Sequence, residues 1–183
     1  MAHDDPQEVF LKPGEYAVGE SSCRIRTVLG SCISIALWCP ALRVGAMSHC
    51  LLPTRGRVGV AGVRGLELRG LDARYTDEAL HLMLHALERR HARAAACSAK
   101  IFGGGNMFPS QRGAGVPVGR RNGEAARRLL RAHGIEVVSE SLFGVGHRQI
   151  VFDIASGDVW ARQLPPVDAI PVSVTALGTE RRP

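Results

Sequence analysis

Cys32 and His49 are the residues in this sequence whose types and spacing could do covalent chemistry. Cys32 ends the stretch TVLGSC, in which Gly30 marks a sharp turn, and His49 stands in a neighbouring apolar segment. A cysteine attacks carbonyl carbon as a thiolate, and a free thiol with a pKa of about 8.5 is only slightly ionised at neutral pH. An imidazole beside the thiol takes up the proton. Two strands joined by a short reversal would bring the two side chains together, which predicts acyl transfer.

The turn before Cys32 suggests where an oxyanion would be held. Gly30 permits backbone conformations that residues with a β-carbon resist. The consecutive amides of Ser31 and Cys32 could then point at a developing negative charge. A structural interpretation stands beside this one, because a free cysteine is most often a small core residue and a lone histidine on an apolar strand is often a satisfied core group.

The residues around this pair resemble the signature of the CheD family of chemoreceptor glutamine deamidases. Similar landmarks follow in order and cover roughly residues 12 to 164. They are PGEYAV at 13–18, RYTDEAL at 74–80, KIFGGGNMF at 100–108, GRRN at 119–122 and GHRQIVFD at 146–153. One GSC triplet is weak evidence, whereas an ordered series of this kind is specific.

The resemblance implies an activity and its participants. It implies that a glutamine in the cytoplasmic methylation region of chemotaxis receptors becomes glutamate without a cofactor. It assigns to Thr27 the role of holding the His49 ring. The residues alone do not separate a deamidase from a protease or a transglutaminase, because all three share an acyl-thioenzyme stage. A non-catalytic adaptor that binds receptors or a CheC-like phosphatase is the alternative from another class.

The hydrophobic periodicity predicts an α+β domain. The expected strands are 24–29, 33–38, 43–52, 99–102, 135–141, 149–154 and 158–164. The expected helices are 72–91 and 122–133. We expect the first three strands to form one antiparallel unit, covered by the first helix. The resemblance implies a single-domain, three-layer sandwich of mostly antiparallel strands with two main helices, similar to the cytotoxic necrotizing factor deamidase toxins.

Side-chain spacing gives finer expectations for the two helices. In the first, the apolar stripe consists of Leu80, Met83, Leu84 and Leu87, and the opposite face carries Asp77, His81, His85 and Glu88. Asn122 is expected to cap the second helix, with Gly134 just beyond its end. Its arginines are expected on a solvated face that could also guide acidic receptor helices: Arg120, Arg121, Arg127, Arg128 and Arg131.

Length and composition indicate one ordinary globular domain. The chain has 183 residues, of which 45% are hydrophobic and 22% charged. We expect a single domain over residues 1–183, with a core at about 12–164 and a loosely held tail at 165–183. The sequence has neither a bilayer-length apolar run nor a signal pattern, so we expect a cytoplasmic protein without membrane insertion. An odd set of five cysteines favours reduced thiols.

The net charge of +6 suggests a polyanionic or acidic partner. The basic residues are nearly all arginine and are dispersed, without the aromatic residues that accompany a nucleic-acid surface. We therefore expect no nucleic acid, and an acidic receptor surface fits the charge better.

A glycine-rich loop follows the strand at 99–102. Gly103, Gly104, Asn106, Met107 and Phe108 are expected to form a wall of the substrate groove, with the last two as apolar contacts. A phosphate-binding loop is disfavoured because the Gly-Lys-Ser/Thr ending of a P-loop is missing, and a plain tight turn is the structural alternative. The cysteines and histidines match no strong zinc spacing, so no metal site is predicted.

Overall fold

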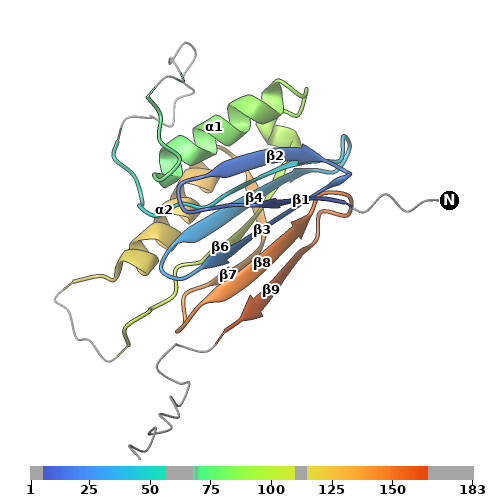
Figure 1. Cartoon of the computed structure of the whole chain (residues 1–183). Coiled ribbons are helices and arrows are strands. Elements are labelled where there is room, and N and C mark those ends of the chain that lie inside the picture. The colour runs from blue at the N-terminus through green and yellow to red at the C-terminus, as the bar shows by residue number, and fades with distance from the viewer. Residues whose placement is uncertain (1–5, 57–67, 69, 110–114, 165–183) are drawn as a thin grey trace, which may run out of the picture.

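The protein folds into three layers, with two helices on one side of two stacked sheets (Figure 1). The computed structural model describes residues 6–56, 68, 70–109 and 115–164. The strands are β1 (Gln7–Phe10), β2 (Tyr16–Glu20), β3 (Cys23–Leu29), β4 (Ile33–Cys39), β5 (Val44–Ser48), β6 (Ser98–Gly103), β7 (Glu136–Leu142), β8 (Arg148–Asp153) and β9 (Val159–Gln163). The helices are α1 (Thr76–Glu88) and α2 (Val118–Ala132), with a short 3-10 helix at Ala94–Ala96. The predicted three-layer sandwich with two main helices is confirmed.

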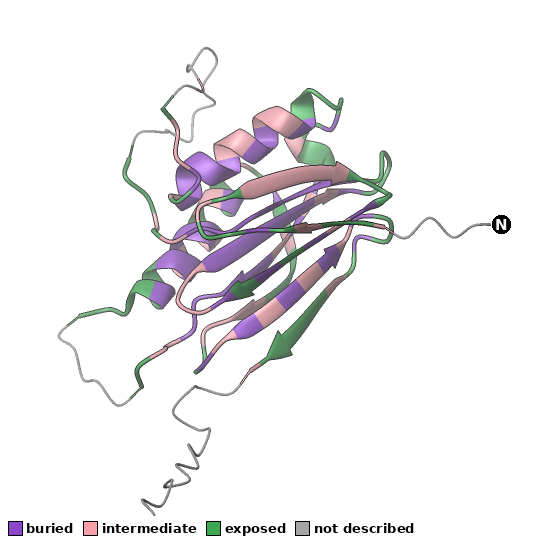
Figure 2. Ribbon diagram, viewed as in Figure 1, coloured by how far each residue is buried: buried purple, intermediate pink, exposed green. Residues whose placement is uncertain are grey.

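The two sheets have different neighbours and therefore different burial. A five-stranded sheet, in the order β2-β5-β4-β6-β7, lies between the helices and a four-stranded sheet in the order β1-β3-β8-β9. The central strand of the five-stranded sheet, β4, is almost wholly buried (Figure 2). In the four-stranded sheet, β3 and β8 alternate between buried and more exposed positions. One apolar core fills the space under the helices, and a second fills the space between the sheets. The strand pairs are antiparallel except β1 with β3 and β6 with β7.

The prediction that the first three expected strands form one antiparallel unit is wrong for the first of them. Only β4 and β5 pair with each other, whereas β3 belongs to the other sheet and pairs with β1 and β8. The link Gly30–Cys32 therefore carries the chain from one sheet to the next. Alternation within a strand reports which faces are buried, and it carries no information about which strand lies alongside.

Both helices begin elsewhere than the sequence suggested. Helix α1 starts at Thr76 and ends at Glu88, and its predicted apolar stripe is buried. Asp77, expected on the solvated face, is only 4% exposed, because the first turn of α1 packs under the segment that follows β5. Helix α2 starts at Val118, so Asn122 lies inside it and does not cap it. Gly134 follows the helix with a φ of 67°, as predicted for that position.

Strands β1 and β2, each at one edge of its sheet, were not predicted from the sequence. They are short, and neither shows a clean apolar alternation. Residues 156–158 lie in the turn that joins β8 to β9, and Gly157 there has a φ of 79°. The stretch at 54–70 is rich in glycine and arginine, which predicts a loop, and it falls largely outside the described residues. The expected tail at 165–183 also falls outside them. Within the described part of the chain, no helix is both long and apolar enough to cross a membrane.

Candidate active site

Cys32 and His49 lie on one face of adjacent segments, where β4 begins and just after β5 ends. Ile33 and Cys50 form an antiparallel bridge, in which each amide donates to the other residue's carbonyl, over 3.0 Å and 2.8 Å. Because side chains alternate along an extended strand, Cys32 and His49 share the opposite face at diagonal positions. Diagonal neighbours on one face are within reach of long side chains. This face looks into the space between the two sheets, where Cys32 packs against the inter-sheet core.

Burial differs among the five cysteines. Cys32 is half-buried, whereas the other four are buried. Cys50 is fully covered and lies in the core beneath the helices, on the opposite face of the segment from His49 because successive side chains alternate. Cys32 is thus the thiol that solvent reaches, at the edge of the sandwich rather than in its interior.

The backbone of His49 is held by the segment that leads into β2. The amide of His49 donates to the Glu15 carbonyl over 2.8 Å, and the amide of Gly14 donates to the His49 carbonyl over 2.8 Å. These two bonds continue the pairing of β2 with β5 past the end of the strand. The histidine is 3% exposed, so its ring lies in a fixed, largely dry position. This gives the stretch PGEYAV a role that periodicity alone did not reveal.

Thr27 contacts the His49 ring. Its Oγ1 donates to the Leu11 carbonyl over 2.8 Å and lies 2.8 Å from Nδ1 of His49. A threonine hydroxyl carries one hydrogen, and the Leu11 carbonyl can only accept, so that hydrogen is used there. Nδ1 must therefore carry the proton and donate to Oγ1. The other ring nitrogen, Nε2, is left with a free lone pair, which is the form a general base needs.

The electrostatic environment keeps both groups of the pair neutral. Burial raises the pKa of the Cys32 thiol, and the residue's own backbone amide opposes this shift by favouring the thiolate. Burial lowers the pKa of His49, while the Leu11 carbonyl and the Glu15 carboxylate oppose that shift. Both shifts favour the neutral forms, a thiol at Cys32 and an imidazole at His49. Such a pair is suited to proton transfer at the moment of attack.

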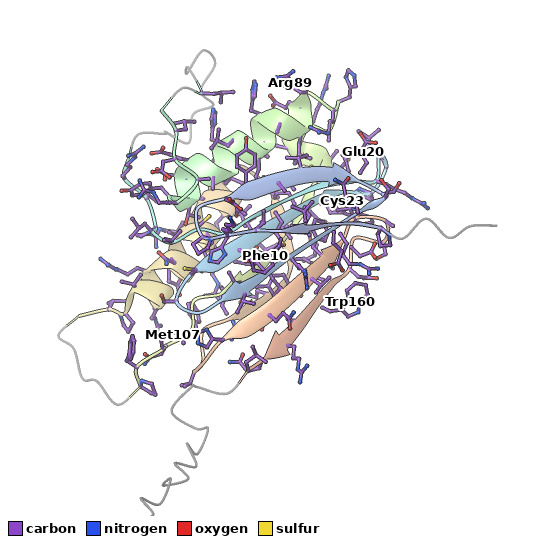
Figure 3. The ribbon with its side chains drawn as sticks, viewed as in Figure 1. Phe10, Glu20, Cys23, Arg89, Met107 and Trp160 are labelled. Carbon is purple, nitrogen blue, oxygen red and sulfur yellow. The ribbon has the colours of Figure 1, made fainter. Side chains whose placement is uncertain are left out.

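Gly30 is required for space rather than for backbone freedom. Its φ is not among the positive values found in this chain, so the conformational reason given from the sequence is wrong. A β-carbon at position 30 would lie 2.9 Å from Sδ of Met107 and 3.6 Å from Nδ1 of His147. The turn is thus covered closely by two side chains that the sequence places far away. Figure 3 shows Met107 on the loop that leaves β6, at the end of the molecule where α2 begins.

The glycine loop after β6 clamps the turn that carries Cys32. The amide of Gly104 donates to the Cys32 carbonyl over 2.8 Å, and the amide of Gly105 donates to the Gly30 carbonyl over 2.9 Å. Gly103 has a φ of 105°, and a β-carbon there would lie 2.2 Å from the Cys32 carbonyl oxygen. Gly103 and Gly104 are buried, so they back the turn instead of lining an open groove.

The outer part of the same loop is accessible. Asn106 and Met107 are half-buried and Phe108 is 63% exposed. The amide of Phe108 donates to Oδ1 of Asn106 over 3.0 Å, which fixes the direction in which the loop leaves the turn. Because Met107 also packs on Gly30, this part of the loop forms an apolar border beside Cys32.

Comparison with known proteins identifies the family. The CheD family, described as CheD chemotactic sensory transduction, matches residues 65–163. A protein of Albidiferax ferrireducens named "Probable chemoreceptor glutamine deamidase CheD 2" is 58% identical over 163 residues, which is 88% of this chain and 90% of that protein. This chain belongs to the CheD family.

More distant CheD relatives share the same extent. A CheD protein of Dechloromonas aromatica is 42% identical over 87% of this chain and 89% of its own length. One from the archaeon Pyrococcus horikoshii is 36% identical over 86% of this chain and 93% of its own length. Similarity thus covers nearly all of each protein, and the family expected from the residues around Cys32 is confirmed.

Two buried side chains support the CheD site without having been predicted to do so. Arg148 is 6% exposed and donates to carbonyls at the ends of β6 and β7, including Gly103 over 2.9 Å. Asn122 is fully buried, and its Nδ2 donates to the Ser31 carbonyl over 3.1 Å and to the Leu51 carbonyl over 2.8 Å. Both stand in stretches that resemble family landmarks, which was the only signal for them in the sequence.

Proposed function

We propose that this protein is a protein-glutamine deamidase, which converts glutamine in chemoreceptors to glutamate by a Cys/His mechanism. The observation that carries the proposal is the contact between Thr27 and Nδ1 of His49, because it leaves Nε2 free as a base on the face that carries Cys32. The names of the relatives, chemoreceptor glutamine deamidases, supply the substrate class.

The reaction begins with attack on the side-chain amide of the substrate glutamine. His49 Nε2 takes the Cys32 proton as the sulfur forms a bond to the amide carbon, and the carbonyl oxygen becomes an oxyanion. The imidazolium then returns the proton to the leaving nitrogen, so that the carbon–nitrogen bond breaks and ammonia departs. The product of this half-reaction is a thioester between Cys32 and the glutamyl side chain.

Hydrolysis of the thioester completes the cycle. His49, neutral again, takes a proton from water as its oxygen attacks the thioester carbon, and a second oxyanion forms. Collapse of this intermediate breaks the carbon–sulfur bond, and the proton on His49 returns to the sulfur. The net change is water consumed, ammonia released and glutamine converted to glutamate, with Cys32 and His49 restored.

The backbone amides of Ser31 and Cys32 are suited to stabilise both oxyanions. Neither amide donates a hydrogen bond to another residue in the described parts of the chain. Gly30 is packed against Met107, and the turn is clamped by the glycine loop, so these donors are held before the substrate arrives. Donors that need no rearrangement during the reaction are worth most to the transition state.

The outer loop provides a place for the substrate chain beside Cys32. We assign Asn106, Met107 and Phe108 to this wall, since they are accessible and follow directly on the buried glycines. An exposed aromatic side chain beside a nucleophile is a typical contact for a protein substrate. The cytoplasmic methylation region of receptors would require the protein to act in the cytoplasm, and a CheC-like phosphatase remains a further partner proposed from the family.

Mass spectrometry on a receptor cytoplasmic fragment tests the proposal. Wild-type protein should produce the mass gain of amide-to-acid conversion at specific glutamines, and Cys32→Ala should abolish it. Cys97→Ala is the matched control and should leave activity intact. Cys97 is buried and directly precedes β6, whereas the turn at Cys32 contacts the other end of that strand. Unchanged receptor mass together with retained binding would contradict the proposal and favour the adaptor.

A further inference from the structure

Two peptide planes in the turn before Cys32 carry the amides assigned above to the oxyanion. The amide of Ser31 belongs to the peptide whose carbonyl is that of Gly30, and the amide of Cys32 belongs to the peptide whose carbonyl is that of Ser31. A peptide unit is planar, and the described chain contains no cis peptide, so N–H and C=O in each plane point in opposite directions. Whatever holds a carbonyl therefore aims the amide in the same plane.

Different parts of the fold hold these two planes. The Gly30 carbonyl accepts from the amide of Gly105 over 2.9 Å, so the backbone of the glycine loop sets the first plane. The Ser31 carbonyl accepts from Nδ2 of Asn122 over 3.1 Å. The second plane, whose amide is that of the nucleophile itself, is thus set by one side chain from α2.

The orientation of the Asn122 amide group is unambiguous. Its Nδ2 faces the Ser31 and Leu51 carbonyls, and an oxygen in that position would face two other oxygens without a hydrogen between them. Its Oδ1 is buried and accepts no hydrogen bond from the described residues. Leaving a buried acceptor such as Oδ1 without a hydrogen bond costs free energy of folding. The two bonds that Nδ2 donates, to the Ser31 and Leu51 carbonyls, are therefore what Asn122 contributes at this position.

The second donation links the two sides of the site. Leu51 is the position directly across from Cys32, as the Ile33–Cys50 bridge sets the register. Asn122 therefore ties the residue before the nucleophile to the segment that follows His49. One side chain fixes the spacing of the two segments and the tilt of the Cys32 amide.

We propose that Asn122 is a positioning residue, which orients the backbone amide of Cys32 as an oxyanion donor by binding the Ser31 carbonyl. This inference rests on the proposed deamidase function. It assigns Asn122 no contact with the substrate, because its side chain is fully buried behind the turn. The effect on the reaction passes through the peptide plane between Ser31 and Cys32.

The proposal separates two chemical properties of Cys32 that an experiment can measure independently. Deamidation creates an oxyanion on the substrate, so it depends on the aim of the Cys32 amide. Alkylation by iodoacetamide displaces iodide from a saturated carbon and creates no oxyanion. Loss of Asn122 should therefore impair deamidation far more than alkylation.

The test compares Asn122→Ala and Asn122→Leu with wild type in both reactions. Asn122→Leu has nearly the same shape and lacks the donors. We expect kcat for deamidation of a receptor fragment to fall about 10- to 100-fold in both variants, with little change in KM. The rate constant for alkylation of Cys32 should stay within about threefold of wild type, and its pH dependence should be unchanged.

Ala126→Gly is the matched control for stability. Ala126 lies one turn further along α2 and is fully buried, so the change loosens the same helix but leaves the bonds to Ser31 and Leu51 in place. Thermal melts give the melting temperature of each variant, so that their stabilities can be compared. Ala126→Gly should retain wild-type kcat even where its melting temperature falls as far as that of the Asn122 variants.

Three results would overturn the inference while the wild type is active. They are an unchanged kcat in the Asn122 variants, a parallel loss of alkylation and deamidation, and an equal loss of kcat in Ala126→Gly. A wild-type protein that leaves receptor glutamines unchanged would instead overturn the proposed function, and this inference with it. The two failures are therefore distinguishable.

Discussion

The hydroxyl oxygen of Thr27 lies 2.8 Å from Nδ1 of His49, although Thr27 belongs to the four-stranded sheet and His49 extends a strand of the five-stranded sheet. The His49 ring thus meets its side-chain partner across the space between the sheets. Because the hydroxyl also binds the Leu11 carbonyl, its direction is set by a third segment of the chain. Orientation of the ring therefore requires that the two sheets pack together.

Replacing Thr27 by valine should slow deamidation without unfolding the protein. Thr27→Val keeps the shape of the side chain but removes the acceptor for Nδ1–H, so the ring loses its fixed tautomer and direction. We expect kcat to fall by up to about 100-fold. Thr27→Ser keeps a hydroxyl and should recover most of the activity in the receptor assay. Equal activities of the valine and serine variants would show that His49 does not depend on this contact.

Iodoacetamide should modify Cys32 before the other four cysteines, because Cys32 alone among them is not buried. Peptide mapping after brief alkylation at neutral pH measures this order. Burial raises the pKa of the Cys32 thiol above its usual range, so the rate constant for its alkylation should continue to rise with pH through the range in which a free thiol ionises. A rate constant that levels off below neutral pH would indicate a preformed thiolate–imidazolium pair and contradict the neutral pair described above.

The acid limb of the pH–rate profile for deamidation should lie at a lower pH than the pKa of an ordinary histidine. His49 acts as a base only when neutral, so kcat/KM falls as the pH drops through its pKa in the free enzyme. Burial holds that pKa below the ordinary 6.5, and the limb is expected below this pH. A profile of kcat/KM against pH, in buffers of constant ionic strength, measures the midpoint of this limb. A midpoint above 6.5 would mean that the carbonyl of Leu11 and the carboxylate of Glu15 outweigh burial.

Gly103→Ala should destabilise the protein more than Gly134→Ala does. Both glycines have a positive φ, but a β-carbon at position 103 would lie 2.2 Å from the Cys32 carbonyl oxygen, whereas nothing lies within 4 Å of one at position 134. We expect a loss of about 1 to 2 kcal/mol in the free energy of unfolding for Gly134→Ala, and about 3 kcal/mol or more for Gly103→Ala. Urea unfolding measures both, and equal losses would show that the turn at Cys32 yields to the methyl group.

The alternation of apolar residues was enough to find most of the central strands. It placed β4, β6, β7, β8 and β9 within a few residues of their positions. Strands β4, β6 and β8 bury at least one face against a core, whereas β7 and β9 lie at sheet edges and carry half-buried and exposed side chains. The same reasoning missed β1 and β2, which are short and lack a clean alternation of apolar residues. It also could not reveal that β3 leaves the sheet of β4, since pairing depends on contacts between distant segments.

Asn122 shows why local patterns mislead at a functional site. An asparagine between arginines and a helix-forming stretch looks like a cap, because caps are where asparagine most often stands in helices. Its actual partners, Ser31 and Leu51, come from distant parts of the sequence. Gly30 is a second case. A glycine is needed there because Met107, on a loop distant in the sequence, occupies the space of a β-carbon, and not because of the backbone conformation of Gly30.

The sequence by itself determined the chemical types in this protein: a thiol after a glycine turn, an imidazole on a nearby apolar segment, and the ordered stretches that resemble the CheD family. Alternation along the strands also determined that His49 and Cys50 face opposite ways. Only the tertiary structure decided the tautomer of His49, the neutral state favoured by its burial and the clamp on the peptide planes around Cys32. These properties arise where side chains and carbonyls from separate segments meet, and such contacts exist only after the two sheets and α2 have packed.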